Sequence, residues 1–102
     1  MKVKIPEPGG ICQSLQGRDK GRYYLVVNVN PDGSVLVTDG NFKRLAAPKK
    51  KNLKHLRLLP EKAESIAQKL LSGEHVFDTE IYSALKIYNY PQPAESADGE
   101  NN

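Results

Sequence analysis

The sequence has little of what a disulfide framework, a zinc site or a membrane segment requires. Its 102 residues include one cysteine, Cys12, one methionine and no tryptophan. One thiol cannot form an internal disulfide, and with only two histidines it does not make a structural zinc site. No apolar run approaches the roughly 18 residues that span a bilayer, and residues 1–6 lack the apolar segment of a signal peptide. We therefore expect a cytoplasmic protein with no metal, no cofactor and no membrane contact.

Groups that could form a catalytic centre are also scarce. The two histidines, His55 and His75, have no nucleophile close in sequence that their surroundings would activate. Residues 17–22 have the glycines of a phosphate-binding loop, but they lack its Gly-Lys-Ser/Thr ending and no long helix follows. The sequence therefore predicts that the protein is not an enzyme, and we assign no catalytic residue.

Charge is present, but it is unevenly distributed along the chain. Up to Arg57 there are 12 Lys and Arg against 4 Asp and Glu, a net +8, whereas from Leu58 onward there are 3 against 8, a net −5. The overall charge of +3 conceals this division. A basic stretch of this kind is typical of a surface that binds a polyanion, although charged side chains also keep small domains in solution.

Apolar alternation predicts five short strands between residues 10 and 60. The clearest covers residues 23–29, where Tyr23, Leu25, Val27 and Val29 form an apolar face at period two. The others are expected at residues 11–15, 35–38, 41–45 and 53–58. In the last of these, the three-residue step from Leu53 to Leu56 favours a bulge or a 3₁₀ turn. Five strands with tight turns are typical of a small barrel, which leaves no open edges.

The apolar period changes to that of a helix after Pro60. A first helix is expected between Pro60 and Gly73 and a second over residues 79–88, with Asp78 or Thr79 as its N-cap. The expected apolar stripe of the first helix consists of Ala63, Ile66, Ala67, Leu70 and Leu71, and that of the second of Ile81, Ala84, Leu85 and Tyr88. Either the stripes pack on each other and on the strands, or they leave an apolar groove for a protein partner.

These patterns divide the chain into four segments. We expect an irregular lead-in over residues 1–9, a β domain over residues 10–60 and a helical pair over residues 61–89. Residues 90–102 have acidic side chains and prolines but no large apolar residue after Tyr90, so composition predicts a disordered acidic tail.

The segments Gly10-Ile11-Cys12 and Gly17 to Val27 resemble a KOW motif, in which a charged turn ending in glycine precedes an apolar strand and a hairpin. Residues 35–40 and 49–56 extend the likeness. Together they resemble the fourteen-e family of large-subunit ribosomal proteins of archaea and eukaryotes, and more closely the short KOW-domain RNA-binding proteins of Gram-positive bacteria. The resemblance covers residues 10–60; the two helices fit only the bacterial group, and the acidic tail is unmatched.

This resemblance implies a mainly β fold with an α appendage: a small SH3-like five-stranded barrel of KOW type followed by two C-terminal helices. It also implies a non-catalytic RNA-binding protein associated with the ribosome or with translation, whose partner is structured, ribosomal RNA. The alternative is a protein–protein interaction adaptor that uses the same barrel and the helices, because SH3-like barrels bind proteins as readily as RNA.

The cationic side chains point independently to an RNA backbone as the partner. The candidate RNA-binding residues are Arg18, Lys20, Arg22, Lys43, Arg44, Lys49, Lys50, Lys51, Lys54 and Arg57. Tyr24 and His55 are candidates for stacking on bases, whereas Tyr23 is expected in the core. Each has a plainer interpretation: a lysine triplet is often a solvated loop, Asp19 can hold its turn by accepting backbone N–H groups, and His55 can pack or bond to the backbone.

Overall fold

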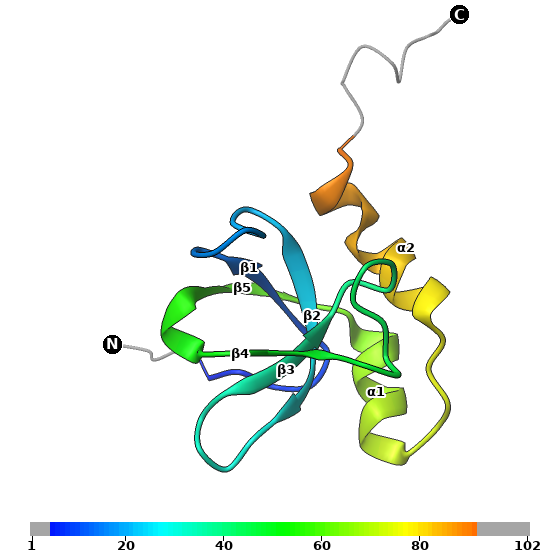
Figure 1. The fold of residues 1–102 in the computed structure, drawn as a ribbon. Helices are drawn as coiled ribbons and strands as arrows, with labels where there is room; N and C mark the ends of the chain where they lie inside the picture. Colours follow the sequence, from blue (N-terminus) through cyan, green and yellow to red (C-terminus); the bar gives the residue numbers. More distant parts are fainter. Residues whose placement is uncertain (1–4, 92–102) are drawn as a thin grey trace, which may run out of the picture.

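The computed structural model describes residues 5–91, which form a five-stranded antiparallel sheet followed by two α-helices (Figure 1). The strands are β1 (Gly10–Ser14), β2 (Tyr23–Val29), β3 (Val35–Thr38), β4 (Lys49–Lys51) and β5 (Leu56–Lys62). A one-turn 3₁₀ helix, η1 (Leu53–His55), joins β4 to β5, and the helices are α1 (Glu64–Ser72) and α2 (Asp78–Asn89). The strand order is β4-β3-β2-β1-β5, so β4 and β5 are edge strands and the sheet is not closed.

The strand predictions are confirmed in part: the first strand is shifted by one residue, and the last, predicted at residues 53–58, covers Leu56–Lys62 and so continues beyond the predicted limit of the β domain at residue 60. β2 and β3 have the predicted bounds, and η1 is the 3₁₀ turn that the Leu53–Leu56 step favoured. The strand predicted at residues 41–45 is wrong. The carboxylate of Asp39 accepts the backbone N–H groups of Asn41 at 2.9 Å and Lys43 at 2.8 Å, so this segment folds as a side-chain-capped loop. The fourth strand is the lysine triplet instead, and it pairs with β3.

The helix boundaries differ from the prediction at both N-termini. Pro60 lies in edge strand β5, in the stretch where the pairing with β1 shifts register. The ladder is irregular there, so a residue without a backbone N–H is tolerated. α1 begins only at Glu64, and it ends as predicted at Gly73, which has a left-handed φ of 80°. Asp78 does not cap α2, because its carboxylate accepts the N–H of Leu45 at 2.7 Å.

The predicted stripe of α2 is confirmed, while that of α1 is narrower than expected. Ile81 and Leu85 are buried, with Ala84 and Tyr88 packed against them. In α1 the buried residues are Ile66 and Ala67, whereas Leu71, which was expected in the stripe, is 77% exposed.

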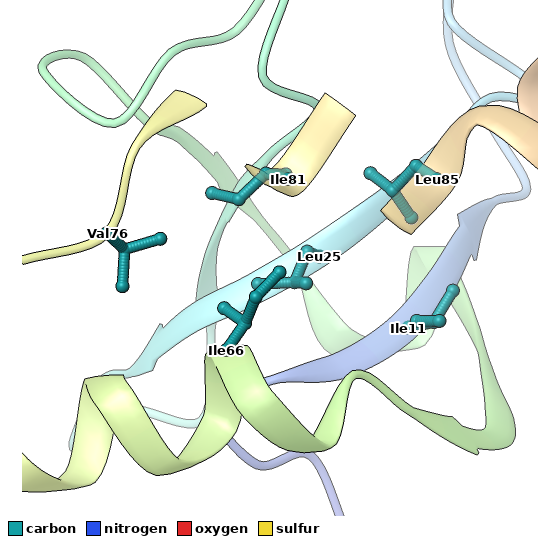
Figure 2. Packing of buried hydrophobic residues seen from close by; sticks show 6 residues of the cluster. All are labelled: Ile11, Leu25, Ile66, Val76, Ile81 and Leu85. Atoms are coloured by element: carbon teal, nitrogen blue, oxygen red, sulfur yellow. The ribbon is translucent and has the colours of Figure 1, made fainter. Parts of the chain in front are cut away.

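Strand β2 is buried on both faces, because each face of the sheet packs against a separate hydrophobic cluster. The cluster between the sheet and the helices is made of Ile11, Leu25, Ile66, Val76, Ile81 and Leu85 (Figure 2). The cluster on the other face is made of Cys12, Tyr24, Val26, Val35, Val37 and Leu56. Successive side chains of β2 therefore enter the two hydrophobic clusters in turn: Leu25 enters one, and Tyr24 and Val26 enter the other. This is typical of a strand that is covered on both faces.

Helix α2 is fastened to the sheet at both of its ends. Near its start, Gly40 in the β3–β4 loop lies so close that a Cβ there would collide with the backbone of Asp78 and Tyr82. Near its end, the amide of Asn89 accepts the N–H of Tyr23 at 2.8 Å and donates to the Tyr23 carbonyl at 3.1 Å. The pairing of β2 with β3 ends at Leu25, so Asn89 takes the place of a strand partner beyond the ladder. The C-terminal end of α2 is thereby held beside the β1–β2 turn.

The predicted disorder of residues 92–102 and the first four residues of the lead-in lie outside the described residues. Over residues 5–91, no helix is both long enough and apolar enough to cross a membrane.

Candidate functional site

The turn between β1 and β2, residues 17–22, which we call the basic turn, is organised by the carboxylate of Asp19. Its Oδ2 accepts the Tyr24 hydroxyl at 2.6 Å and pairs with the Lys49 ammonium at 3.0 Å. Its Oδ1 accepts the Ser14 hydroxyl at 2.8 Å and pairs with the Lys51 ammonium at 3.0 Å. One carboxylate therefore fixes the basic turn against strand β4, which lies three strands away in the sheet.

This network perturbs both acidic groups that take part in it. Desolvation alone would raise the pKa of Asp19, but the hydrogen bonds from Tyr24, Lys49, Lys51 and Ser14 hold that pKa well below its usual range. Burial, the hydrogen bond to Asp19 and the negative charge of Asp19 together raise the pKa of Tyr24 well above its usual range. Asp19 thus remains a carboxylate and Tyr24 a neutral hydroxyl donor at all physiological pH values.

Three of the predicted site residues, Tyr24, Lys49 and Lys51, belong to this network, and two of them, Tyr24 and Lys51, are buried and not available to a ligand. Lys51 is 8% exposed, and its ammonium also donates to Ser14 Oγ at 3.0 Å and to the Gln16 carbonyl at 3.4 Å. The assignment of Lys51 to an RNA-binding surface is therefore wrong. Tyr24 is 1% exposed, so it cannot offer a ring face to a base, and its assignment as a stacking platform is also wrong. Both were misplaced because the residues that bury them are distant in sequence.

A second acidic anchor, Asp39, fixes the β3–β4 loop against the basic turn. The side chain of Asp39 is 2% exposed and pairs with the Arg22 guanidinium at 3.4 Å. The same guanidinium lies 4.7 Å from the ring centroid of Phe42, which places Phe42 beside the turn, and Lys43 and Arg44 follow it directly in the chain. Arg44 Nε donates to the Asn41 carbonyl at 3.3 Å within this loop.

Strand β5 joins the same surface through Gln13 of β1. The side-chain amide oxygen of Gln13, Oε1, accepts hydrogen bonds from Arg57 Nε at 3.1 Å and from Arg57 Nη2 at 2.8 Å. The Gln13 amide nitrogen donates to the Gly21 carbonyl of the basic turn at 3.2 Å. Arg57 is therefore held beside the turn with its guanidinium exposed.

The predicted cations thus divide into two groups. The basic turn gathers Arg18, Lys20, Arg22, Lys43, Arg44, Lys49 and Arg57, a set that we call the basic face. Lys50 and Lys54 lie apart from it and line a hollow of about 700 Å³ together with Asp32, to which Lys50 is paired at 3.5 Å. His55 is half-buried in η1, and its backbone carbonyl accepts the N–H of Leu15. Its assignment as a stacking residue stays a prediction.

Three cations of the basic face, Arg18, Lys20 and Lys43, have no partner among the described residues. All three are exposed, and within residues 5–91 their side chains make no hydrogen bond or ion pair. Arg18, Lys20 and Arg22 line a hollow of about 230 Å³ against Asn89 and Tyr90 at the C-terminal end of α2. The partial negative charge of that helix end favours cations nearby. The N–H groups of these cations that point to solvent remain free to bind an anion.

Phe42 is the residue of this surface that the sequence analysis missed. The residue is 65% exposed, and the guanidinium of Arg22 lies over its ring. A signal was present in the sequence, since Asp39-Gly40 precedes an aromatic residue that Lys43 and Arg44 follow directly. The strand predicted there concealed it, because a strand would alternate its side chains between two faces.

Among residues 5–91, Cys12 is a buried free thiol. Burial raises the pKa of the Cys12 thiol to about 12, so the thiol stays protonated at neutral pH. No cluster of three or more His, Cys, Asp or Glu suited to a metal ion occurs between residues 5 and 91. Neither a family model nor a curated protein matches the sequence.

Proposed function

We propose that this chain is a non-catalytic RNA-binding protein of KOW type that acts in translation. It binds structured RNA, such as ribosomal RNA, through the basic face. The observation that carries the proposal is the convergence of cations from the β3–β4 loop, β4 and β5 on the basic turn, which has cations of its own. Asp19 and Asp39 hold these segments in place from the interior side. Preorganised cations with free donors are what a phosphate backbone requires.

We propose further that the sheet is a partly open SH3-like barrel. The two edge strands, β4 and β5, are consecutive in the chain and are joined by the single turn η1. Leu56 of edge strand β5 lies in the same buried cluster as Val35 and Val37 of β3, the strand next to the other edge. Side-chain packing rather than a β4–β5 ladder would close such a barrel.

A protein-interaction adaptor is the second candidate function. It is favoured by Leu71 and Ile87, which are 77% and 71% exposed on α1 and α2. The two candidates differ in what accompanies the protein from cells. Nucleic acid that high salt removes, detected by the ultraviolet absorbance ratio, supports RNA binding, whereas a stoichiometric protein partner that resists salt supports the adaptor.

The proposal predicts binding to RNA that weakens steeply with salt. About four or five phosphate contacts give a slope of log K against log salt of about −3 to −5, because each contact releases condensed counterions. Fluorescence anisotropy with a labelled structured RNA at several salt concentrations measures this slope. Binding that is undetectable at low salt, or insensitive to salt, would contradict the proposal.

Charge reversal locates the surface. We expect Lys20→Glu and Lys43→Glu each to weaken binding several-fold and to reduce the salt slope by roughly one. Lys62→Glu is the matched control, because it makes the same change in net charge at the opposite end of β5, where Lys62 is paired with Glu7 at 3.2 Å. An equal loss in all three variants would mean that only net charge matters and that the basic face is not the site.

A further inference from the structure

Phe42 is a large apolar residue that is exposed to solvent, and it takes no part in the hydrophobic core. It belongs to neither of the two hydrophobic clusters, and the residue is 65% exposed. The other phenylalanine, Phe77, is also exposed, but it packs edge-on against His75 at 4.3 Å between ring centroids and has no cation–ring contact of this kind. Phe42 alone combines a solvent-facing aromatic ring with an arginine stacked on it, 4.7 Å from the ring centroid.

The loop holds the ring of Phe42 in a fixed position. Asp39 accepts the N–H groups on either side of Phe42, those of Asn41 and Lys43. Gly40 packs directly against the backbone of α2, which ties the loop to the helix (Figure 1). Arg22 is itself held by the buried carboxylate of Asp39 at 3.4 Å. The exposed ring therefore stands on a rigid support, which lowers the entropic cost of binding a flat ligand.

We propose that the Phe42 ring is a stacking platform for an unpaired base of the bound RNA. Arg22 lies over the ring, yet the residue is 65% exposed, and the next residue in the chain, Lys43, offers an exposed cation for a neighbouring phosphate. A π face accepts any base, but only a base that has left its helical stack can reach it. The inference rests on the proposed RNA binding and defines its class of ligand: RNA with a bulged or looped-out base, not a continuous duplex.

A purely structural role for the Arg22–Phe42 contact predicts a different result. If the ring served only to shield the arginine, its removal would change stability or weaken all RNA binding alike. A stacking platform instead contributes only to RNA that supplies an unpaired base. The two roles are therefore separated by comparing two RNA molecules rather than by one affinity.

The test uses the full chain and two probes: a blunt RNA duplex with an internal bulge of unpaired adenosines, and the same duplex without the bulge. We expect the protein to bind the bulged duplex about 5-fold or more tightly, as stacking of one base on an aromatic ring contributes. Phe42→Ala and Phe42→Leu are expected to lose that preference while they keep the affinity for the blunt duplex. Phe42→Tyr is expected to retain it. A 2-aminopurine in the bulge should lose fluorescence on binding to the parent protein and not to Phe42→Leu.

Phe77→Ala is the matched control, because it removes the other exposed phenyl ring and should leave the preference unchanged. The leucine variant preserves apolar bulk in the loop, so its unchanged melting temperature would exclude misfolding as the cause. A preference that survives Phe42→Leu, or a protein that binds both duplexes equally, would overturn the stacking role and leave RNA binding intact. Binding to neither duplex at low salt would overturn the proposed function itself.

Discussion

At the residue level, the Asp19 carboxylate offsets two ammonium groups that would otherwise repel each other. Lys51 and Asp19 are both largely buried, with side-chain exposures of 9% and 10%. Asp19→Asn removes the only acidic partner of this lysine within residues 5–91. Leaving a buried charge uncompensated costs roughly 3 kcal/mol, at the lower end of the usual range because the network lies near the surface. Urea denaturation at neutral pH measures the loss.

Asp32→Asn is the matched control for that substitution. Asp32 pairs with Lys50 at 3.5 Å, but the two side chains are 60% and 64% exposed, so we expect a much smaller change in stability. Equal losses in the two variants would show that the network around Asp19 has no special importance.

The lowered pKa of Asp19 adds a dependence on pH. A carboxyl whose pKa is depressed by folding stabilises the protein above its unfolded value of about 4, and this contribution is lost as the pH falls toward the folded value. We expect the unfolding free energy of the parent protein to fall more steeply below pH ~4 than that of Asp19→Asn. Parallel curves from urea denaturation at several pH values would contradict this origin.

At the level of elements, the contact between the β3–β4 loop and α2 depends on glycine at position 40. Gly40 and Gly33 both have a positive φ, of 77° and 91°, so alanine is strained at either position. A Cβ at Gly33 meets nothing within 4 Å, whereas at Gly40 it collides with the backbone of Asp78. We expect Gly40→Ala to lose about 1–3 kcal/mol more stability than Gly33→Ala, because α2 must move away.

Hydrogen exchange distinguishes this displacement from a general loss of stability. The amides of α2 should exchange faster in Gly40→Ala than in Gly33→Ala at equal global stability, because only the first variant detaches the helix from the loop. The displacement would also move Phe42 and Arg22, so binding of bulged RNA should weaken in the same variant. Identical exchange in the two variants would show that the loop accommodates the added methyl group.

At the level of the whole molecule, the sheet and the helices share one core, although composition divides the chain near residue 60. Ile11 and Leu25 of the sheet pack in the same cluster as Ile66, Ile81 and Leu85 of the helices (Figure 2). A chain ending after Lys62 would expose this face of β1 and β2 to water. We expect the full chain to unfold in one cooperative transition and the shortened chain to show none in calorimetry. A cooperative transition of the shortened chain would instead establish two separate domains.

The division of charge has a corresponding spatial arrangement around the same core. The basic face is built from the sheet and its turns, whereas most acidic side chains of the described helical part belong to α1 and α2 or adjoin them. Residues 61–91 have five acidic and three basic side chains, a net charge of −2, which disfavours phosphates on the helical side. If the chain binds RNA as proposed, the uneven charge of the sequence would favour one orientation of the molecule on it.

The sequence by itself determined the elements whose signals are local. The bounds of β2 and β3, the 3₁₀ turn at Leu53, the end of α1 at Gly73 and the buried stripe of α2 all follow from periodicity and turn chemistry within a few residues. The general location of the cations was also predictable, because their number in the first half of the chain is a matter of composition.

Only the tertiary structure decided which of those residues face solvent. Lys50 and Lys51 are neighbours in sequence, yet one is exposed and the other is enclosed by an acidic partner 32 residues away. Tyr24 is buried because β2 is covered on both faces, and Phe42 is exposed because the Asp39 carboxylate folds a loop where alternation predicted a strand. Burial and ion pairing depend on which distant segments meet, and periodicity along a single chain does not contain that information.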